Sequence, residues 1–199
     1  MSIRILIVED EPIISDDIES TLIANDYDIA GKAYSSTMAL DMLINRSPDL
    51  VLLDIAIKGD KDGIDVAAII REKYHIPFIY LTSFSDKITL ERAKPTMPYG
   101  YIVKPFKDRD IITSIELAMF RFAMENNTSV LDKTVVENKF NIKLTKMEFL
   151  ILKMIWEGKT NQTAAKELFL SVNTVKTHVR NLFEKCNVRN RNELMVMLR

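Results

Sequence analysis

Along the first 124 residues, short apolar runs alternate with segments in which apolar residues recur at a helical spacing of three and four. The apolar runs predict five strands, at residues 3–8, 27–33, 50–54, 77–81 and 101–103. The intervening segments predict five helices, at residues 14–22, 38–44, 64–73, 86–94 and 108–124. Strands and helices that alternate in this way form a parallel sheet with helices on both faces. We therefore expect a doubly wound, five-stranded α/β domain.

The third predicted strand ends on a candidate functional residue. Residues 50–53 are four consecutive apolar residues, which predicts a strand buried on both faces, and the run closes on the carboxylate of Asp54. The composition of residues 58–63, Lys-Gly-Asp-Lys-Asp-Gly, predicts a loop. Ligands bind at the strand ends of open α/β sheets, so Asp54 can act as a nucleophile or a metal ligand. Taken alone, this stretch is equally compatible with a solvated loop residue or a helix cap.

Three other predicted strands are also followed by polar side chains. Glu9 and Asp10 follow the first strand, Thr82 the fourth, and Lys104 the fifth. Because the carboxyl ends of parallel strands share one edge, these side chains should converge there with Asp54. Three carboxylates repel one another, so a cation has to offset them, and ligands that are all oxygen atoms favour Mg²⁺. With Lys104 as a fixed positive charge and Thr82 as a hydroxyl donor, this edge suits a phosphoryl group on or near a carboxylate.

Charge is divided unevenly along the chain, although the net charge of all 199 residues is only −1. Residues 141–199 hold 11 Lys and Arg against 5 Asp and Glu, a net of +6, and residues 1–140 carry −7. A basic tail on an acidic body favours a nucleic-acid-binding module. No apolar stretch reaches the roughly 18 residues of a membrane span, and the first residues do not resemble a signal peptide. Cys186 is the only cysteine, which favours a reducing, cytoplasmic location.

The basic tail predicts four helices. The first begins at a capping box formed by Thr145 and Glu148 and ends at Gly158. The others are expected at residues 161–169, 172–185 and 192–198. In the third of the four, a set of polar residues should face outward: Asn173, Lys176, Thr177 and Arg180. A helix, a tight turn and a second helix with a basic exposed face indicate a helix-turn-helix.

The segment between these two regions, residues 125–141, is polar and irregular in pattern. We expect a linker that can include a short helical piece, with a simple extension of the preceding helix as the alternative. The expected organisation is therefore a domain at residues 1–124, a linker at 125–141 and a second domain at 142–199.

Residues 1–124 resemble a response-regulator receiver domain, which has a flavodoxin-like α/β fold. The matching motifs, in the order and spacing of that family, are Glu9-Asp10, Asp54, Thr82, Tyr101 and Lys104-Pro105. The loop from Asp54 to Gly63 departs from the commonest form, because it is one residue longer and lacks the usual proline.

This resemblance implies a role for each matched residue. Asp54 would be the phosphoacceptor, and the residues that bind or respond to the phosphoryl group would be Thr82, Tyr101 and Lys104. Mg²⁺ would be held by the side chains of Asp10 and Asp54 and the carbonyl of Ala56, with Glu9 acting through water. The family also implies a cis peptide bond before Pro105.

Residues 142–199 resemble the LuxR-type DNA-binding domain. The match is strongest at residues 171–179, Ser-Val-Asn-Thr-Val-Lys-Thr-His-Val, and extends to Glu-Gly-Lys-Thr-Asn at 157–161. The resemblance implies that Lys176, Thr177 and Arg180 reach base edges. It also implies that Thr174 and Asn161 hold phosphates, and that the domain binds duplex DNA as a dimer.

Together the two resemblances predict a two-component response regulator that acts as a transcription factor. A histidine kinase would phosphorylate Asp54 with Mg²⁺, and phosphorylation would control homodimerisation or exposure of the DNA-binding domain. One alternative is an interaction module that works without phosphorylation, against which the intact Asp, Thr and Lys set argues. Another is an aspartate-nucleophile phosphohydrolase, but such enzymes need a second Asp where this chain has Ala56. We therefore expect no turnover of outside substrates and no association with a membrane.

Overall fold

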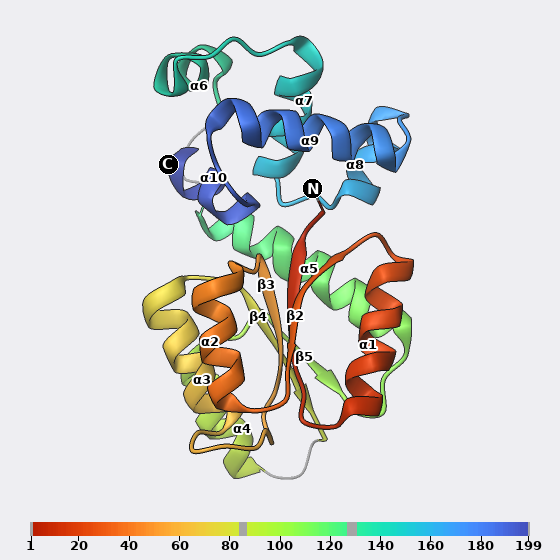
Figure 1. Cartoon of the computed structure of the whole chain (residues 1–199), viewed down its shortest axis with the longest axis vertical. Helices are drawn as coiled ribbons and strands as arrows, with labels where there is room; N and C mark the ends of the chain where they lie inside the picture. Colours follow the sequence, from red (N-terminus) through yellow and green to blue (C-terminus); the bar gives the residue numbers. More distant parts are fainter. Residues whose placement is uncertain (1, 84–86, 127–130, 199) are drawn as a thin grey trace. The chain divides into compact units, whose positions relative to one another are not determined.

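The computed structural model describes residues 2–83, 87–126 and 131–198 (Figure 1). The chain divides into two compact units, one spanning residues 4–118 and the other holding the helical segment from residue 119 onward. A sheet organises the first unit, and helices alone form the regular structure from residue 119 onward in the part of the chain that is described.

The first unit contains one five-stranded sheet in which all neighbouring strands are parallel. Its strands are β1 (Arg4–Val8), β2 (Asp28–Ala33), β3 (Leu50–Asp54), β4 (Phe78–Thr82) and β5 (Gly100–Val103). Their order across the sheet is β2-β1-β3-β4-β5, so β3 is the central strand. All five residues of β3 are buried, as its unbroken apolar run predicts. The expected fold class and all five expected strands are confirmed.

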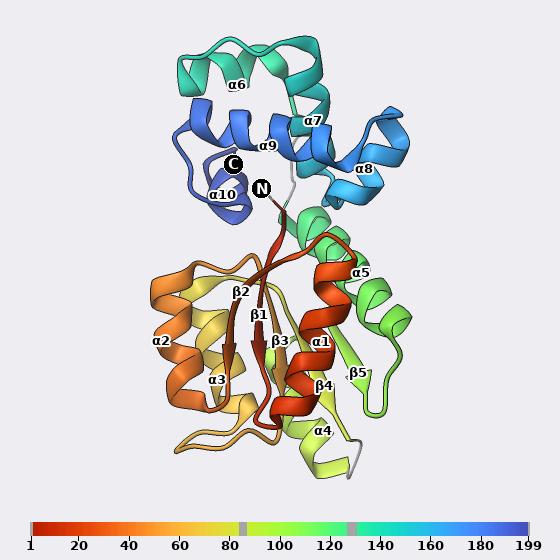
Figure 2. The same ribbon diagram turned by 45° about the vertical axis from the view of Figure 1, so that its right-hand side comes forward.

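Helices cover both faces of this sheet. They are α1 (Pro12–Ala24), α2 (Ser36–Arg46), α3 (Gly63–Ile69), α4 (Lys87–Ala93) and α5 (Asp108–Asn126). Figures 1 and 2 show α1 and the start of α5 on one face and α2, α3 and α4 on the other. This arrangement brings the carboxyl ends of the strands to one edge, which positions the candidate site.

Two helices end differently from the sequence-based expectation. The helix expected to be continuous over residues 64–73 is α3 followed by one π-helical turn, Ile70–Tyr74. The helix expected to stop before Pro95 continues from α4 into a 3₁₀ turn, Lys94–Thr96, which includes that proline. Proline fits there because its fixed φ suits the first positions of a helical turn. The expected start of that helix at Asp86 lies outside the described residues.

The second unit contains α6 (Lys133–Phe140), α7 (Lys146–Trp156), α8 (Asn161–Leu168), α9 (Val172–Cys186) and α10 (Arg191–Leu198). The expected capping box is present, because Thr145 Oγ1 accepts from the Glu148 amide at 3.2 Å and Glu148 Oε2 accepts from the Thr145 amide at 2.7 Å. Thr160 and Ser171 likewise cap α8 and α9 by accepting the amide three residues on. These caps satisfy amides that have no partner within their own helix.

Helix α6 lies within the segment expected to be a linker. Its Val136 is 3 % exposed and belongs to the same apolar cluster as Leu152 of α7 and Leu182 of α9. Leu131 and Phe140 pack against this cluster as well. The second half of the expected linker therefore folds as part of the helical unit, and residues 127–130 lie outside the described part.

A buried arginine joins two helices of this unit. Arg191 is 4 % exposed, and its guanidinium donates to the carbonyls of Ile155 at 3.1 Å and Lys159 at 2.6 Å. Ile155 lies in the last turn of α7 and Lys159 follows its end, where backbone acceptors lack partners within the helix. Arg191 thus links α10 to the end of α7. Among the described residues, no helix is long and apolar enough to cross a membrane.

The capping box generates a stability prediction for the second unit. Thr145→Ala removes the side-chain acceptor of the box and should lower the free energy of unfolding by about 1 kcal/mol. The measurement is urea unfolding followed by fluorescence of Trp156, the single tryptophan, which is buried at the end of α7. Lys146→Ala, one residue on and exposed, is the control. Equal midpoints for the two variants would show that the cap contributes nothing.

Candidate functional site

Three carboxylates meet at the carboxyl edge of the sheet. Glu9 and Asp10 follow β1, and Asp54 is the last residue of β3, which pairs directly with β1. One oxygen from each carboxylate lies within 4.8 Å of the other two. Glu9 is fully buried and Asp54 is 5 % exposed. The sheet topology therefore assembles the acidic cluster that the sequence predicts.

Lys104, which follows β5, places its ammonium between two of these carboxylates. Its Nζ lies 2.6 Å from Glu9 Oε2 and 2.7 Å from Asp54 Oδ2. The other oxygen of Asp54, Oδ1, accepts from the Ala56 amide at 3.0 Å. The peptide bond between Lys104 and Pro105 is cis, as the family resemblance implies.

The pKa values of Glu9 and Lys104 are both raised, for different reasons. Burial raises the pKa of Glu9 above its ordinary value, and the hydrogen bond from Lys104 only partly offsets that effect. Burial alone would lower the pKa of Lys104, but its hydrogen bonds to Asp54 and Glu9 outweigh burial and raise it. The ammonium is therefore a permanent charge, and its carboxylate partners share a site in which excess negative charge is costly.

The donor set of this cluster fits a hard divalent cation. Carboxylate oxygens are the ligands that Mg²⁺ prefers, and three of them approach one another from two adjacent strands. Two ammonium groups, those of Lys104 and Lys58, face three carboxylates, which leaves a net negative charge that a dication would offset.

The loop after Asp54 approaches the strand so closely that it needs a glycine. Gly63 begins α3, and a Cβ added there would lie 2.0 Å from the carbonyl oxygen of Asp54 and 2.8 Å from the Cα of Ile55. Its amide donates to the Ile55 carbonyl at 2.9 Å. Any side chain at position 63 would therefore push the loop away from the site.

This loop carries ion pairs that the sequence did not indicate. Lys58 Nζ lies 3.1 Å from Asp10 Oδ2, and Arg92 of α4 lies 2.6 Å from Asp62 Oδ2. Asp62 also caps α3 in a capping box with Asp65. Only the unusual length of the loop and its missing proline signalled that its contacts would differ from the common pattern.

The two remaining residues predicted for this site lie on β4 and β5. Thr82 ends β4 with 9 % exposure, and its carbonyl accepts from the Lys104 amide at 2.8 Å. Tyr101 is half-buried on β5, with its ring centroid 5.6 Å from that of Tyr80 on the neighbouring strand. Burial raises the pKa of Tyr101 above its ordinary value. Thr82 therefore lies at the same edge as Lys104, whereas Tyr101 packs on the face of the sheet behind it.

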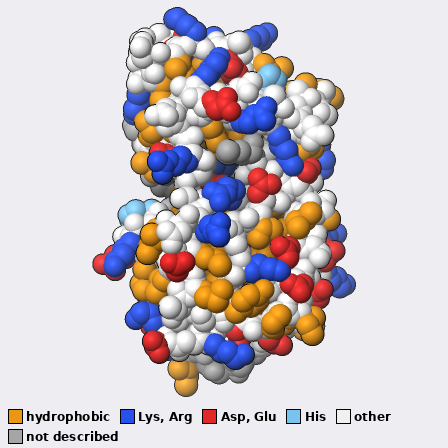
Figure 3. All heavy atoms as spheres, viewed as in Figure 1, with side chains coloured by type: hydrophobic (Ala, Val, Ile, Leu, Met, Phe, Trp, Pro, Cys, Tyr) orange, Lys and Arg blue, Asp and Glu red, His pale blue; other side chains and the backbone are white. Residues whose placement is uncertain are grey.

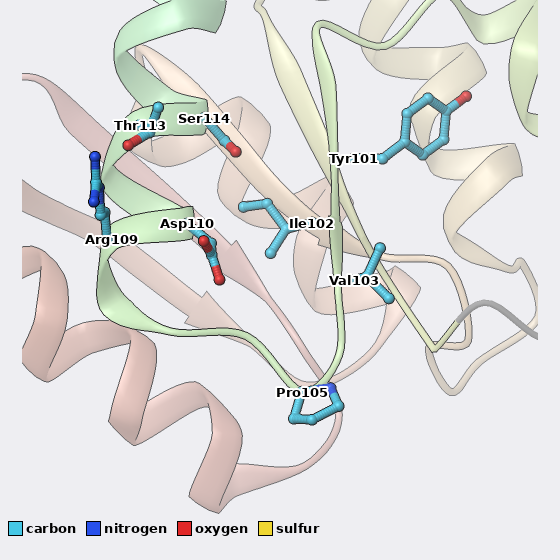
Figure 4. A pocket seen from close by; sticks show the side chains of 8 residues that line it. All are labelled: Tyr101, Ile102, Val103, Pro105, Arg109, Asp110, Thr113 and Ser114. Atoms are coloured by element: carbon cyan, nitrogen blue, oxygen red, sulfur yellow. The ribbon is translucent and has the colours of Figure 1, made fainter.

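A pocket of about 590 Å³ lies beside β5 and the first turns of α5. Figure 4 shows Tyr101 and Val103 on one side of β5 and Ile102 on the other, facing α5, where Arg109 and Ser114 lie. None of the three clustered carboxylates lines it. The pocket is therefore separate from the acidic edge.

In the second unit, α8 and α9 are joined by a tight turn. Phe169 ends α8 with a φ of 54°, and the Leu170 amide donates to the Ala165 carbonyl at 2.9 Å. Val175 and Val179 of α9 are buried in the apolar cluster. The two helices and their turn form the expected helix-turn-helix.

The polar residues of α9 emerge opposite its buried face. Thr174, Thr177 and Arg180 are exposed, and Lys176 is half-exposed. The Thr177 hydroxyl donates to the Asn173 carbonyl at 3.0 Å. The structure thus brings four of the five predicted DNA-contacting residues to one helix surface.

Asn161 does not belong to that surface. It is the first residue of α8 and is only 5 % exposed. Its contact with a phosphate of bound DNA stays a prediction. Thr160 caps α8, and the residue after the cap packs inward, which the motif alone could not show.

With this geometry established, comparison with known protein families gives two matches. Residues 5–116 match the response regulator receiver domain, and residues 143–198 match the bacterial regulatory proteins of the luxR family. The chain therefore belongs to the response regulators of two-component systems, in the group that carries a LuxR-type DNA-binding domain.

Curated relatives agree with this assignment. The transcriptional regulatory protein PdtaR of Mycobacterium tuberculosis is 36 % identical over 140 residues, which cover 68 % of each chain. LiaR, a transcriptional regulatory protein of Bacillus subtilis, is 31 % identical over 206 residues, covering 98 % of this chain and 95 % of its own. The similarity to LiaR thus extends over both matched regions.

Solved structures share the fold. The signal receiver domain of a modulated diguanylate cyclase from Desulfovibrio desulfuricans aligns with a TM-score of 0.59 and 32 % identity, covering 61 % of this chain and 97 % of that domain. The response regulator RcsB of Salmonella typhimurium aligns with a TM-score of 0.53 over 98 % of both chains. At 21 % identity, that second alignment shows the fold alone.

The contacts of Lys104 generate a stability prediction. Lys104→Met leaves two buried carboxylates without their ammonium and should lower the free energy of unfolding by about 3–5 kcal/mol in EDTA. The measurement is urea unfolding followed by circular dichroism. Adding Asp54→Asn to the variant should restore part of the loss, because one of the two repelling charges is removed. A loss no larger than that of the exposed control Lys107→Met would contradict this account.

Proposed function

We propose that this protein is a transcription regulator that a histidine kinase switches by phosphorylating Asp54. A carboxylate oxygen of Asp54 would attack the phosphorus of the kinase's phosphohistidine, and the bond from phosphorus to the imidazole nitrogen would break. The observation that carries the proposal is the position of Asp54, at the end of the central strand, beside the ammonium of Lys104 and the carboxylates of Glu9 and Asp10. The same chain carries a helix-turn-helix.

The residues around Asp54 suit this transfer. We propose that Mg²⁺ is held by the side chains of Asp10 and Asp54 and the carbonyl of Ala56, with Glu9 acting through water. When bound, the ion supplies positive charge that offsets the phosphoryl oxygens. The Lys104 ammonium already touches Asp54 and can pair with a phosphoryl oxygen, and the Thr82 hydroxyl can donate to another.

The surroundings of Asp54 favour a lasting acyl phosphate over turnover. A phosphohydrolase of the haloacid-dehalogenase type would need a general acid two residues after its nucleophile, and Ala56 supplies none. The proposed role is therefore that of a receiver rather than of an enzyme acting on outside substrates. An interaction module that ignores phosphorylation would not need the buried arrangement of Asp54 and Lys104.

For the second unit we propose binding to duplex DNA through α9. Lys176, Thr177 and Arg180 would reach base edges in the major groove, and Thr174 would hold a phosphate. A dimer would engage two half-sites. We assign the protein to the cytoplasm because its proposed partners, DNA and a kinase domain, meet there.

The proposed coupling runs through Thr82 and Tyr101. Movement of Thr82 toward a phosphoryl group would vacate space that the Tyr101 ring can enter. This would alter the surface formed by α4, β5 and the start of α5. Phosphorylation would then favour homodimerisation or exposure of α9.

Apolar side chains on the sheet-containing unit, such as Ile13 and Ile88, are more than 70 % exposed and offer surface for such a dimer. Figure 3 shows similar apolar side chains on the face that it presents.

The phosphoacceptor assignment predicts a complete loss of labelling in one variant. Asp54→Asn removes the attacking carboxylate and should abolish phosphate uptake from a small phosphodonor such as acetyl phosphate in Mg²⁺. Incorporated phosphate can be measured by intact-protein mass. Asp60→Asn, an exposed Asp in the following loop, should label like the wild type. Labelling of the Asp54 variant at the wild-type rate would overturn the assignment.

The DNA-binding assignment predicts losses at individual side chains. Lys176→Ala and Arg180→Ala should each cost about 1–3 kcal/mol on the specific site if they pair with bases. The measurement is fluorescence anisotropy on specific and random duplexes. Lys153→Ala, an exposed lysine on α7, is the control. Equal losses on both duplexes would assign the two residues to phosphate contacts, and an affinity independent of salt would rule out DNA binding.

A further inference from the structure

The acidic edge has a second lysine besides Lys104, and the two are held differently. Lys104 is 13 % exposed and contacts both Glu9 and Asp54. Lys58 lies in the loop after β3, has a side chain that is 76 % exposed, and contacts Asp10 through one oxygen, Oδ2, at 3.1 Å. Each of the three carboxylates therefore has an ammonium beside it. The ammonium at Asp10 is the one that solvent surrounds.

The loop fixes the backbone of Lys58 while leaving its side chain free to turn. The Lys58 carbonyl accepts from the Ser36 amide at 2.9 Å, at the start of α2. Gly59 follows with a φ of 127° and packs so closely on Ser36 that an added Cβ would overlap Ser36 Oγ. The Lys61 amide also donates to Ser36 Oγ, at 3.4 Å. The ammonium can thus leave Asp10 by rotation of the side chain alone, with the loop in place.

An ammonium and a dication cannot both remain beside Asp10 without cost. Both would draw on the same carboxylate, and like charges only a few ångströms apart repel, even through water. Lys104 avoids this conflict, because its contacts are with Glu9 and Asp54. Lys58 does not, because Asp10 is its only ion-pair partner among the described residues.

We propose that Lys58 competes with Mg²⁺ for Asp10 and so raises the Mg²⁺ concentration at which the site fills. This inference rests on the proposed function, since it assumes that Asp10 is a metal ligand. It gives a role to a residue of the loop from Asp54 to Gly63, which is one residue longer than the commonest form. Lys58 would tune how strongly phosphorylation of Asp54 depends on free Mg²⁺, without taking part in the transfer itself.

The test is a Mg²⁺ titration of the full chain, followed by NMR shifts of amides in the loop. Lys58→Gln removes the charge and keeps a polar side chain that is one atom shorter, and it should bind Mg²⁺ about three- to tenfold more tightly than the wild type. Lys58→Arg keeps the charge and should remain within about twofold of the wild type. Lys61→Gln is the matched control, because Lys61 is exposed in the same loop and has no ion-pair partner among the described residues. The gain in Lys58→Gln should also shrink as salt rises from about 0.01 M to about 1 M.

The outcomes separate this inference from the function on which it rests. Equal affinities for the wild type and Lys58→Gln would overturn the competition, as would weaker binding by that variant, while leaving the Mg²⁺ site intact. Equal tightening in Lys58→Gln and Lys61→Gln would also overturn it, by showing an effect of net charge alone. If no variant bound Mg²⁺, the metal site itself would be lost, and the competition with it.

Discussion

The receiver depends on a balance of charge at one end of its sheet. Glu9 and Asp54 are buried next to each other, and the ammonium of Lys104 lies within 2.7 Å of both. Without that ammonium, two carboxylates would share a site from which water is largely excluded, which is costly. The parallel topology brings the carboxylates at the ends of β1 and β3 close together. The same topology places Lys104, which follows β5, at that edge of the sheet. The acidic edge therefore holds a fixed positive charge next to Asp54.

The helical unit relies on another kind of constraint. Each of α7, α8 and α9 begins at a side-chain cap, and the buried Arg191 donates to one carbonyl in the last turn of α7 and to one after its end. These local bonds fix where helices start and stop, and the apolar cluster then fixes how they pack. The polar surface of α9 is therefore presented by helices that are capped and packed around one apolar cluster. Helix α5 (Asp108–Asn126) contributes residues to both units, which divide between residues 118 and 119.

The sequence was a good guide to features set by local pattern. Apolar runs located the strands, and the box of Thr145 and Glu148 located the start of a helix, because both depend on residues close together in the chain. The expected topology then predicted that Glu9, Asp10 and Asp54 lie close together, because the carboxyl ends of parallel strands share one edge of the sheet.

Features that depend on distant side chains were not predictable in this way. The ion pairs of Lys58 with Asp10 and of Arg92 with Asp62 join residues that are 48 and 30 positions apart. The burial of Asn161 follows from packing around α8, and the motif that carries it looks the same whether the side chain points in or out. The segment that forms α6 is mostly polar, so its sequence resembles a linker. Its one deeply buried residue, Val136, is too short an apolar signal to predict that the helix packs into the helical unit.

We propose that the phosphorylation state of Asp54 sets the affinity of the chain for DNA. The most direct test measures the affinity of the full chain for one specific duplex, with and without phosphorylation, alongside its molar mass in solution. The account predicts that phosphorylation raises the affinity by roughly five- to 150-fold, the usual size of such coupling. The Thr82→Ala variant should be phosphorylated and yet show little of this gain. The same affinity and the same mass in both states would contradict the account.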